Sequence, residues 1–206
     1  MNGNNNKIIL AATLLVLSSS SAASTRVDDL VYPILKPHSW NAKKHVIYNT
    51  FLGIDQDPIP IISYGYEYDD SYQFITKYDV KEPLEVTQEK ALKNLCKKDV
   101  KLESVTSTGH FAVTGSGSPF SSELILCPNF IQKAQKVLND ETLIIAIPRR
   151  TVIYIGKGSM TEEEKGKFFY LARDTYMDDS FGNALITNLA FEFVNGEATS
   201  IIQYMN

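Results

Sequence analysis

Residues 143–155 read LIIAIPRRTVIYI, and this stretch decides which fold the sequence predicts. Two apolar runs of strand length, 143–147 and 152–155, are separated by Pro148-Arg149-Arg150-Thr151. Short apolar runs on either side of a turn sequence predict a β-hairpin. Hairpin strands pair antiparallel, whereas parallel strands need a long crossover connection. The stretch therefore predicts an antiparallel sheet.

The same pattern recurs on both sides of this stretch. Residues 189–194 and 198–204 flank Asn195-Gly196, which is a strong signal for a two-residue hairpin turn. Residues 61–68 and 72–78 are β-prone aromatic runs around Asp69-Asp70-Ser71, which predict another hairpin. The remaining expected extended segments are 31–35, 46–52, 102–106 and 124–127, the last two joined by a Gly/Ser-rich connection.

Three helices are expected between the strand pairs. One follows Thr87, one begins at Pro128, and the third opens with Thr161 and Glu164 in a capping box and continues to about Tyr176. Helices inserted between hairpins are expected to pack together on one face of the sheet. The prediction is an α+β fold with two layers, a mainly antiparallel sheet, helices on one face and a repeated strand-strand-helix order.

The first residues have the composition of an export signal. Lys7 precedes the apolar run 8–17, and a Ser/Ala-rich segment follows it. A positively charged start, an apolar middle and a small-residue cleavage region follow one another in a secretory signal peptide. A permanent transmembrane helix would need about 20 apolar residues, which is longer than this run. We therefore expect residues 1–23 to be a cleaved signal peptide, 24–206 to be a single α+β domain, and the mature protein to be exported, periplasmic or secreted, without a stable membrane anchor.

Composition limits the partners that can be expected. The chain has 206 residues and a formal net charge of −4, without a stripe of Lys and Arg. Such a surface does not attract phosphate backbones, so nucleic acid is not expected as a partner. Cys96 and Cys127 are the two cysteines. In an oxidising compartment an even pair predicts a disulfide, while two reduced core cysteines are the alternative.

Several short segments resemble a known bacterial family. They are 61–62, 91–95 (ALKNL), 120–126 (FSSELIL), 143–153 (LIIAIPRRTVI) and the helix through Ala172 and Tyr176. With these segments the chain resembles the family catalogued as domain of unknown function 1444. That family has no established reaction, so the resemblance implies a fold and no catalytic activity.

Motifs for catalysis or metal binding are weak. The three histidines, His38, His45 and His110, have no metal-ligand spacing, and no metal or other cofactor is expected. His110 lies in the Gly/Ser-rich stretch 109–122, where it is a weak candidate for a general base or simply a solvated loop residue. That stretch lacks the Gly-Lys-Ser/Thr of a phosphate-binding loop, so we interpret it as a flexible connection.

Two groups of residues are candidates for binding. Arg149 and Arg150 at a hairpin tip could fork onto an anionic ligand, or onto an acidic patch of the chain such as Asp178-Asp179, or remain in solvent. Residues two apart share a strand face, so three tyrosines form a row that suits contact with a ligand or protein. These tyrosines are Tyr64, Tyr66 and Tyr68.

Two hypotheses of different classes follow from these candidates. The first is an exported, non-catalytic binding or accessory protein that uses the tyrosine row or the Arg-Arg turn for an unknown protein or an anionic small molecule. The second is an exported enzyme of hydrolase or transferase type whose site is assembled from scattered residues, including His110. The two differ in whether His110, a carboxylate and a serine converge in one pocket.

Overall fold

A computed structural model describes residues 25–69, 71–116 and 118–205. The predicted signal peptide, residues 1–23, lies outside the described residues, as does Asp70. Within the described residues the chain forms three α-helices and ten strands. They are β1 (Arg26–Lys36), β2 (Tyr48–Thr50), β3 (Ile61–Tyr68), β4 (Tyr72–Phe74), α1 (Leu84–Leu95), β5 (Lys101–Ser104), β6 (Ala112–Ser116), α2 (Pro128–Leu138), β7 (Thr142–Ala146), β8 (Tyr154–Lys157), α3 (Glu162–Met177), β9 (Leu189–Val194) and β10 (Glu197–Gln203).

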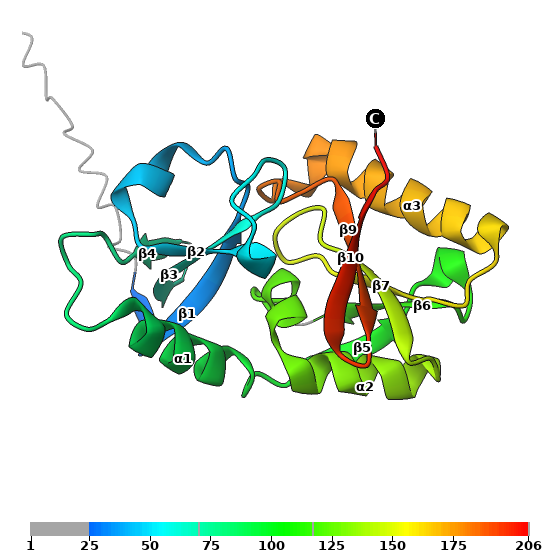
Figure 1. Ribbon diagram of the computed structural model, residues 1–206, viewed down its shortest axis with the longest axis horizontal. Helices are drawn as coiled ribbons and strands as arrows, with labels where there is room; N and C mark the ends of the chain where they lie inside the picture. The colour runs from blue at the N-terminus through cyan, green and yellow to red at the C-terminus, as the bar shows by residue number, and fades with distance from the viewer. Residues whose placement is uncertain (1–24, 70, 117, 206) are drawn as a thin grey trace, which may run out of the picture.

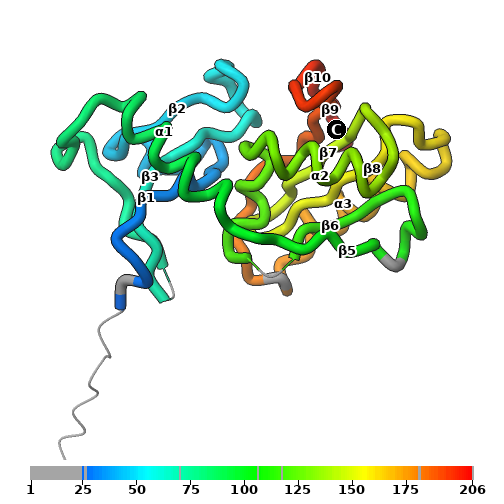
Figure 2. Tube along the Cα trace, turned by 90° about the horizontal axis from the view of Figure 1, so that it is seen from below, coloured from blue at the N-terminus to red at the C-terminus, as the bar shows by residue number. Residues whose placement is uncertain are grey.

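The strands form two sheets that lie side by side (Figures 1 and 2). In the N-terminal half (β1–β4 and α1), β3 pairs with β1, β2 and β4; in the C-terminal half the order is β10-β9-β7-β8-β6-β5. Every pairing between these strands is antiparallel. The predicted α+β class with antiparallel pairing is therefore confirmed.

The layering of the C-terminal half differs from the prediction that helices share one face. Leu143 and Ile145 of β7 belong to the same core cluster as the buried residues of α2, while Ile144 and Ala146 pack with α3. Figure 1 shows α3 and α2 on opposite sides of the strands. The physical reason is the composition of β7, because an unbroken apolar strand must bury both of its faces.

Most local predictions are confirmed, but α1 begins at Leu84, so Thr87 lies within the helix and does not precede it. The β3–β4 and β9–β10 hairpins form, and the latter turns through Asn195 and Gly196, whose φ values are 52° and 87°. Positive φ at both central residues is what a type I′ turn requires. The predicted capping box opens α3, with the Glu164 amide donating to the Thr161 hydroxyl and the Thr161 amide donating to the Glu164 carboxylate.

Two assignments in residues 109–127 are corrected. The expected strand 124–127 is a 3₁₀-helix, Ser122–Leu126, and the expected flexible connection contains β6, which pairs with β5 and β8. The sequence did not predict β6 because Gly115 lies within it, at a point where the neighbouring side chains leave no room for a larger residue. A Cβ atom added there would lie 2.9 Å from the Ile153 side chain, so only glycine lets the neighbouring layers approach.

The two halves are joined by packing and by a disulfide. The ring of Phe51 lies 4.8 Å from that of Phe191, and one continuous cluster of buried residues runs through both halves. Cys96 and Cys127 form a disulfide whose Cα atoms are 5.5 Å apart, which confirms the predicted pairing and ties the end of α1 to the start of α2. No helix in the described part of the chain is long and apolar enough to cross a membrane.

Candidate functional site

The Arg-Arg segment is not an exposed hairpin tip. The connection between β7 and β8 is covered by residues 183–187: the Arg150 amide donates to the Ala184 carbonyl, and the Ile186 amide donates to the Pro148 carbonyl. Arg149 forms an isolated β-bridge with Leu185. The expectation that Arg149 and Arg150 lie at an open hairpin tip is therefore corrected, because a distant segment of the chain folds over them.

Arg149 is used inside the protein. Its side chain is 4% exposed, and its guanidinium donates to the carbonyls of Thr175, Tyr176 and Asn183 at 2.7, 2.8 and 2.8 Å. Thr175 and Tyr176 belong to the last turn of α3, whose carbonyls have no partner within the helix. A further bond of 2.9 Å reaches the Asp179 carboxylate, so the acidic patch expected as one alternative is the charged partner of Arg149.

Arg150 has a different environment. Its guanidinium carbon lies 3.8 Å from the centre of the Tyr72 ring, which comes from β4 in the other half of the molecule. Its Nε atom is buried and has no hydrogen-bond partner among the described residues. A buried donor without a partner costs about 1–3 kcal/mol unless a ligand or water satisfies it. A molecule that enters from outside would reach this atom only after the side chain shifts, whereas the half-buried side chain of Arg150 is itself partly open to solvent.

The side chain of Arg150 borders an open recess between the two halves, which we call the arginine recess. It has a volume of about 420 Å³, within the roughly 300–1,000 Å³ range of ligand pockets. The charged residues of its lining are Glu67, Asp69 and Arg150, and its other lining residues include Tyr68, Ser71, Tyr72, Thr151 and Asn183. The recess joins the β3–β4 turn to the Arg-Arg segment, which are distant in sequence.

The backbone beside Arg150 is held in a strained conformation. Thr151 has φ of 65°, which is a rare value for a β-branched residue. Two hydrogen bonds hold Thr151 in place. Its backbone amide donates to the Ser122 hydroxyl at 3.1 Å, and its hydroxyl accepts from the side-chain amide of Asn183 at 2.7 Å. Strain of this kind persists where the surroundings impose it, and it is common at binding sites.

A buried carboxylate lies behind the arginine recess. Glu123 is 0% exposed; its carboxylate accepts from the Leu35 amide at 3.1 Å and from the Ser122 hydroxyl at 2.7 Å. Burial raises the pKa of Glu123, while the Ser122 hydrogen bond and the charge of Arg150 oppose this shift. Glu123 therefore connects β1 of the N-terminal half to the segment that carries Arg150.

A second cation lies near this carboxylate. Burial, and then the charge of Arg150, lower the pKa of the Lys36 ammonium group, and Glu123 opposes them. The ammonium lies 5.1 Å from the ring centres of Trp40 and Phe74. When all three groups are ionised, Lys36, Arg150 and Glu123 carry one net positive charge. Lys36 and Glu123 do not line the arginine recess, whereas Glu67 and Asp69 do, so this positive balance belongs to the neighbourhood of Arg150 and not to the wall of the recess.

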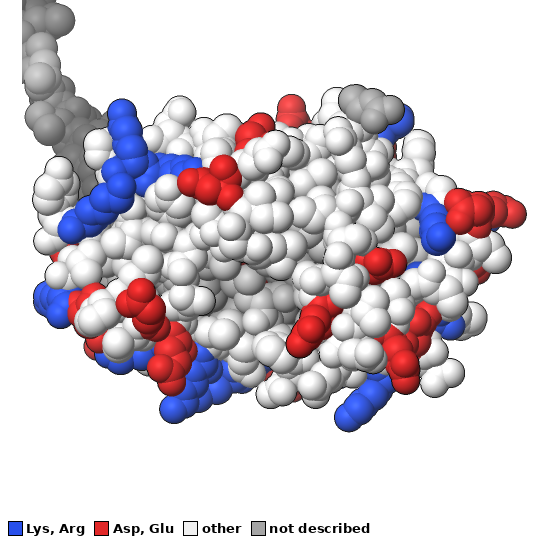
Figure 3. Space-filling view, viewed as in Figure 1, with Lys and Arg blue, Asp and Glu red and all other residues white. Residues whose placement is uncertain are grey.

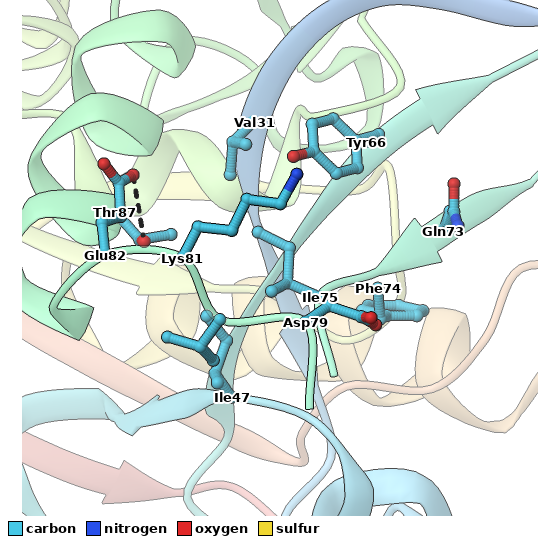
Figure 4. A pocket seen from close by; sticks show the side chains of 11 residues that line it. Val31, Ile47, Tyr66, Gln73, Phe74, Ile75, Asp79, Lys81, Glu82 and Thr87 are labelled. Atoms are coloured by element: carbon cyan, nitrogen blue, oxygen red, sulfur yellow. Dashed lines mark hydrogen bonds between the residues drawn. The ribbon is translucent and has the colours of Figure 1, made fainter. Parts of the chain in front are cut away.

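The tyrosine row is divided by its surroundings. Tyr64 is 1% exposed and its hydroxyl donates to the Asn49 side chain at 3.1 Å, so it belongs to the core under α1. The Tyr68 hydroxyl donates to Gln73 at 2.8 Å. Tyr66 lines a pocket of about 470 Å³ together with apolar residues such as Ile75 (Figure 4). The structure therefore places two of the three tyrosines at cavities, Tyr66 at this pocket and Tyr68 at the arginine recess, and buries Tyr64.

His110, a serine and a carboxylate do line one recess, as the enzyme hypothesis requires, but they form no hydrogen-bonded relay among the described residues. It is exposed and borders a surface recess that also contains Ser159 and Glu164. The Ser159 hydroxyl donates to Asp140 at 2.6 Å, and Glu164 is part of the capping box of α3. Both groups therefore have structural partners, and in the described part of the chain His110 forms no hydrogen bond with either.

Charged side chains are mixed on the surface. On the face shown in Figure 3, Lys and Arg alternate with Asp and Glu around the edge, and the centre is largely free of charged groups. Within the described residues no group of three or more His, Cys, Asp or Glu side chains could hold a metal ion. The chain matches no protein-family model, no curated protein and no solved structure, so its resemblance to domain of unknown function 1444 stays a prediction.

Proposed function

We propose that this chain is an exported, non-catalytic binding protein that captures the anionic group of a small molecule in the arginine recess. The observation that carries this proposal is the half-buried Arg150 side chain, which lines an open recess and whose Nε atom has no hydrogen-bond partner among the described residues. A guanidinium presents donors in a planar fork that matches a carboxylate or a phosphate. The Tyr72 ring supports the plane of that fork by stacking.

The shape of the recess and the guanidinium of Arg150 favour a small molecule with one anionic group. Arg150 is the cation of the lining and attracts the anionic group. Of the two carboxylates in the lining, Glu67 pairs with Lys98, while Asp69 opposes an anion and favours one that stays close to Arg150. A concave recess of about 420 Å³ suits a small molecule better than a flat protein surface would.

Binding is favoured over catalysis by the state of the candidate catalytic groups. An exported enzyme with a scattered site is the alternative, and it would need a base close to a nucleophile. Ser159 already donates to Asp140, and Glu164 is committed to the start of α3. We therefore assign His110 no role in the proposed function.

Export is supported by the disulfide and by the predicted signal peptide. Disulfides persist in oxidising compartments and are rare in the cytosol, so the Cys96–Cys127 bridge agrees with an extracytoplasmic location. N-terminal sequencing of the exported protein should find its first residue between Ala23 and Thr25. Soluble protein that still begins at Met1 would contradict this part of the proposal.

The binding proposal is tested by titrating the mature protein with acetate, succinate and inorganic phosphate by calorimetry or NMR. At least one of these anions should bind, and Arg150→Gln should weaken it by about 10-fold or more, since a charged hydrogen bond contributes roughly 1.5–3 kcal/mol. Arg150→Lys should also weaken it, because lysine keeps the charge without the fork. The matched control is Arg173→Gln, which removes another arginine, exposed and near a tyrosine ring on α3.

Two results would contradict the proposal. One is that no anion in the panel binds the wild-type protein. The other is that Arg150→Gln and Arg173→Gln change the affinity equally while both variants keep the far-ultraviolet circular dichroism spectrum of the wild type.

A further inference from the structure

The pocket beside Tyr66, which we call the tyrosine pocket, lies away from the arginine recess. It is a space of about 470 Å³ between the strands β3 and β4 and the loop that leads into α1 (Figure 4). Apolar side chains form much of its wall, and they come from separate elements of the N-terminal half. They are Val31, Ile47, Phe74 and Ile75.

The mouth of this pocket carries one ammonium group, that of Lys81, and two carboxylates, those of Asp79 and Glu82. In Figure 4 the side chain of Lys81 crosses the pocket with its ammonium group toward Tyr66. Within the described residues Lys81 forms no ion pair and no hydrogen bond. The two carboxylates of the rim already have partners: Asp79 accepts from the Thr76 hydroxyl at 2.5 Å, and Glu82 accepts from Thr87 and pairs with Lys90.

We infer that the tyrosine pocket binds a monocarboxylate with an apolar chain, such as a medium-chain fatty acid. The chain of the ligand packs against Ile47 and Ile75, and its carboxylate meets the ammonium group of Lys81. A second carboxylate at the other end of the ligand is disfavoured, because Asp79 and Glu82 place negative charge on the rim. This site uses other residues than the arginine recess and does not depend on the proposed function.

Octanoate is the probe, and butyrate, octanol and octanedioate are the comparison molecules. Binding is followed by the methyl NMR signals of Ile47 and Ile75. Octanoate should bind more tightly than butyrate by up to about 200-fold, since it has four more methylenes and each buried methylene adds close to fourfold in affinity. Octanol and octanedioate should both bind more weakly than octanoate.

Matched variants test the two parts of the inference. Lys81→Gln should weaken octanoate about fivefold, as expected for an exposed ion pair, while Lys77→Gln in the same loop should have no effect. Val80→Trp should block the mouth, because Val80 lines the pocket and is 42% exposed, so its replacement leaves the core intact. Val86→Trp is the control on an exposed position of α1 that does not line the pocket.

The expected pattern is loss of octanoate binding in Val80→Trp, a weaker affinity in Lys81→Gln, and wild-type affinity in both controls and in Arg150→Gln. The inference is overturned if octanoate does not shift the Ile47 and Ile75 signals. It is equally overturned if octanol binds as tightly as octanoate, or if Val80→Trp binds octanoate like the wild type while keeping its melting temperature.

Discussion

Arg149→Met should lower the free energy of unfolding by about 3 kcal/mol, since it removes the guanidinium and keeps an apolar side chain of similar length. The variant leaves the carbonyls of Thr175, Tyr176 and Asn183 without their charged donor. A hydrogen bond to a charged group contributes roughly 1.5–3 kcal/mol. The loss is smaller than the sum because Tyr176 and Asn183 are only half-buried, so water can reach their carbonyls.

The ion pair with Asp179 should contribute little of this stability. Arg149 is 4% exposed, but the Asp179 side chain is 96% exposed, and an ion pair with one partner in water is worth about 0–1 kcal/mol. Asp179→Asn should therefore cost less than about 1 kcal/mol. Because the ion pair contributes so little to stability, we expect Arg149 to stabilise the fold mainly by capping the carbonyls at the end of α3.

Urea denaturation of the mature protein measures both changes. The control is Arg173→Met, an exposed arginine on α3, which should change stability by less than about 0.5 kcal/mol. The reasoning is refuted if Arg149→Met costs less than about 1 kcal/mol, or if Asp179→Asn costs as much as Arg149→Met.

Three other predictions concern stability. Replacing Cys96 and Cys127 by alanine should cost about 3.5 kcal/mol, since the bridge closes a loop with a sequence separation of 31; an unchanged melting temperature would contradict this. The pKa of Glu123 is raised in the folded protein, so folding favours its protonated form. Wild type should therefore lose stability relative to Glu123→Gln as the pH rises above the ordinary value of 4.5, and parallel pH profiles in urea titrations would refute this. Gly115→Ala should destabilise the protein by about 1–3 kcal/mol, because the added Cβ would lie 2.9 Å from a side-chain carbon. Gly166→Ala in α3 should stabilise it by about 0.5–1 kcal/mol, since nothing lies within 4 Å of the added Cβ. Equal melting temperatures for the two variants would contradict this pair of predictions.

The parts of the fold that depend on neighbouring residues could be predicted from the sequence. Asn195-Gly196 determines its turn through the φ values those two residues allow, and Thr161 with Glu164 closes a capping box within one turn of helix. Pro128 begins α2 where its missing N–H group costs no hydrogen bond. In each case the physical cause lies within a few residues of its effect.

The parts that depend on distant residues could not be predicted in this way. The hydrogen-bond partners of the Arg149 guanidinium come from residues 175–183. The ring that lies against Arg150 belongs to Tyr72 in the other sheet. Glu123 was missed as a buried carboxylate, although a charged residue inside the run 120–127 is a usable signal. Such a residue either faces solvent or needs partners, and only the fold supplies Leu35 as one of them.

The arginine pair illustrates how the two halves of the molecule make one site. Arg149 ends α3 and belongs to the C-terminal half alone, so its replacement should act on stability. Arg150 lies where Tyr72 of the N-terminal half meets the segment held by Ser122 and Glu123, and Glu123 in turn holds the Leu35 amide. The position of the Arg150 guanidinium therefore depends on both halves being docked. Two neighbouring arginines therefore have separate roles. Arg149 finds its hydrogen-bond partners within the C-terminal half, whereas the Nε atom of Arg150, at the junction of the two halves, has no hydrogen-bond partner among the described residues.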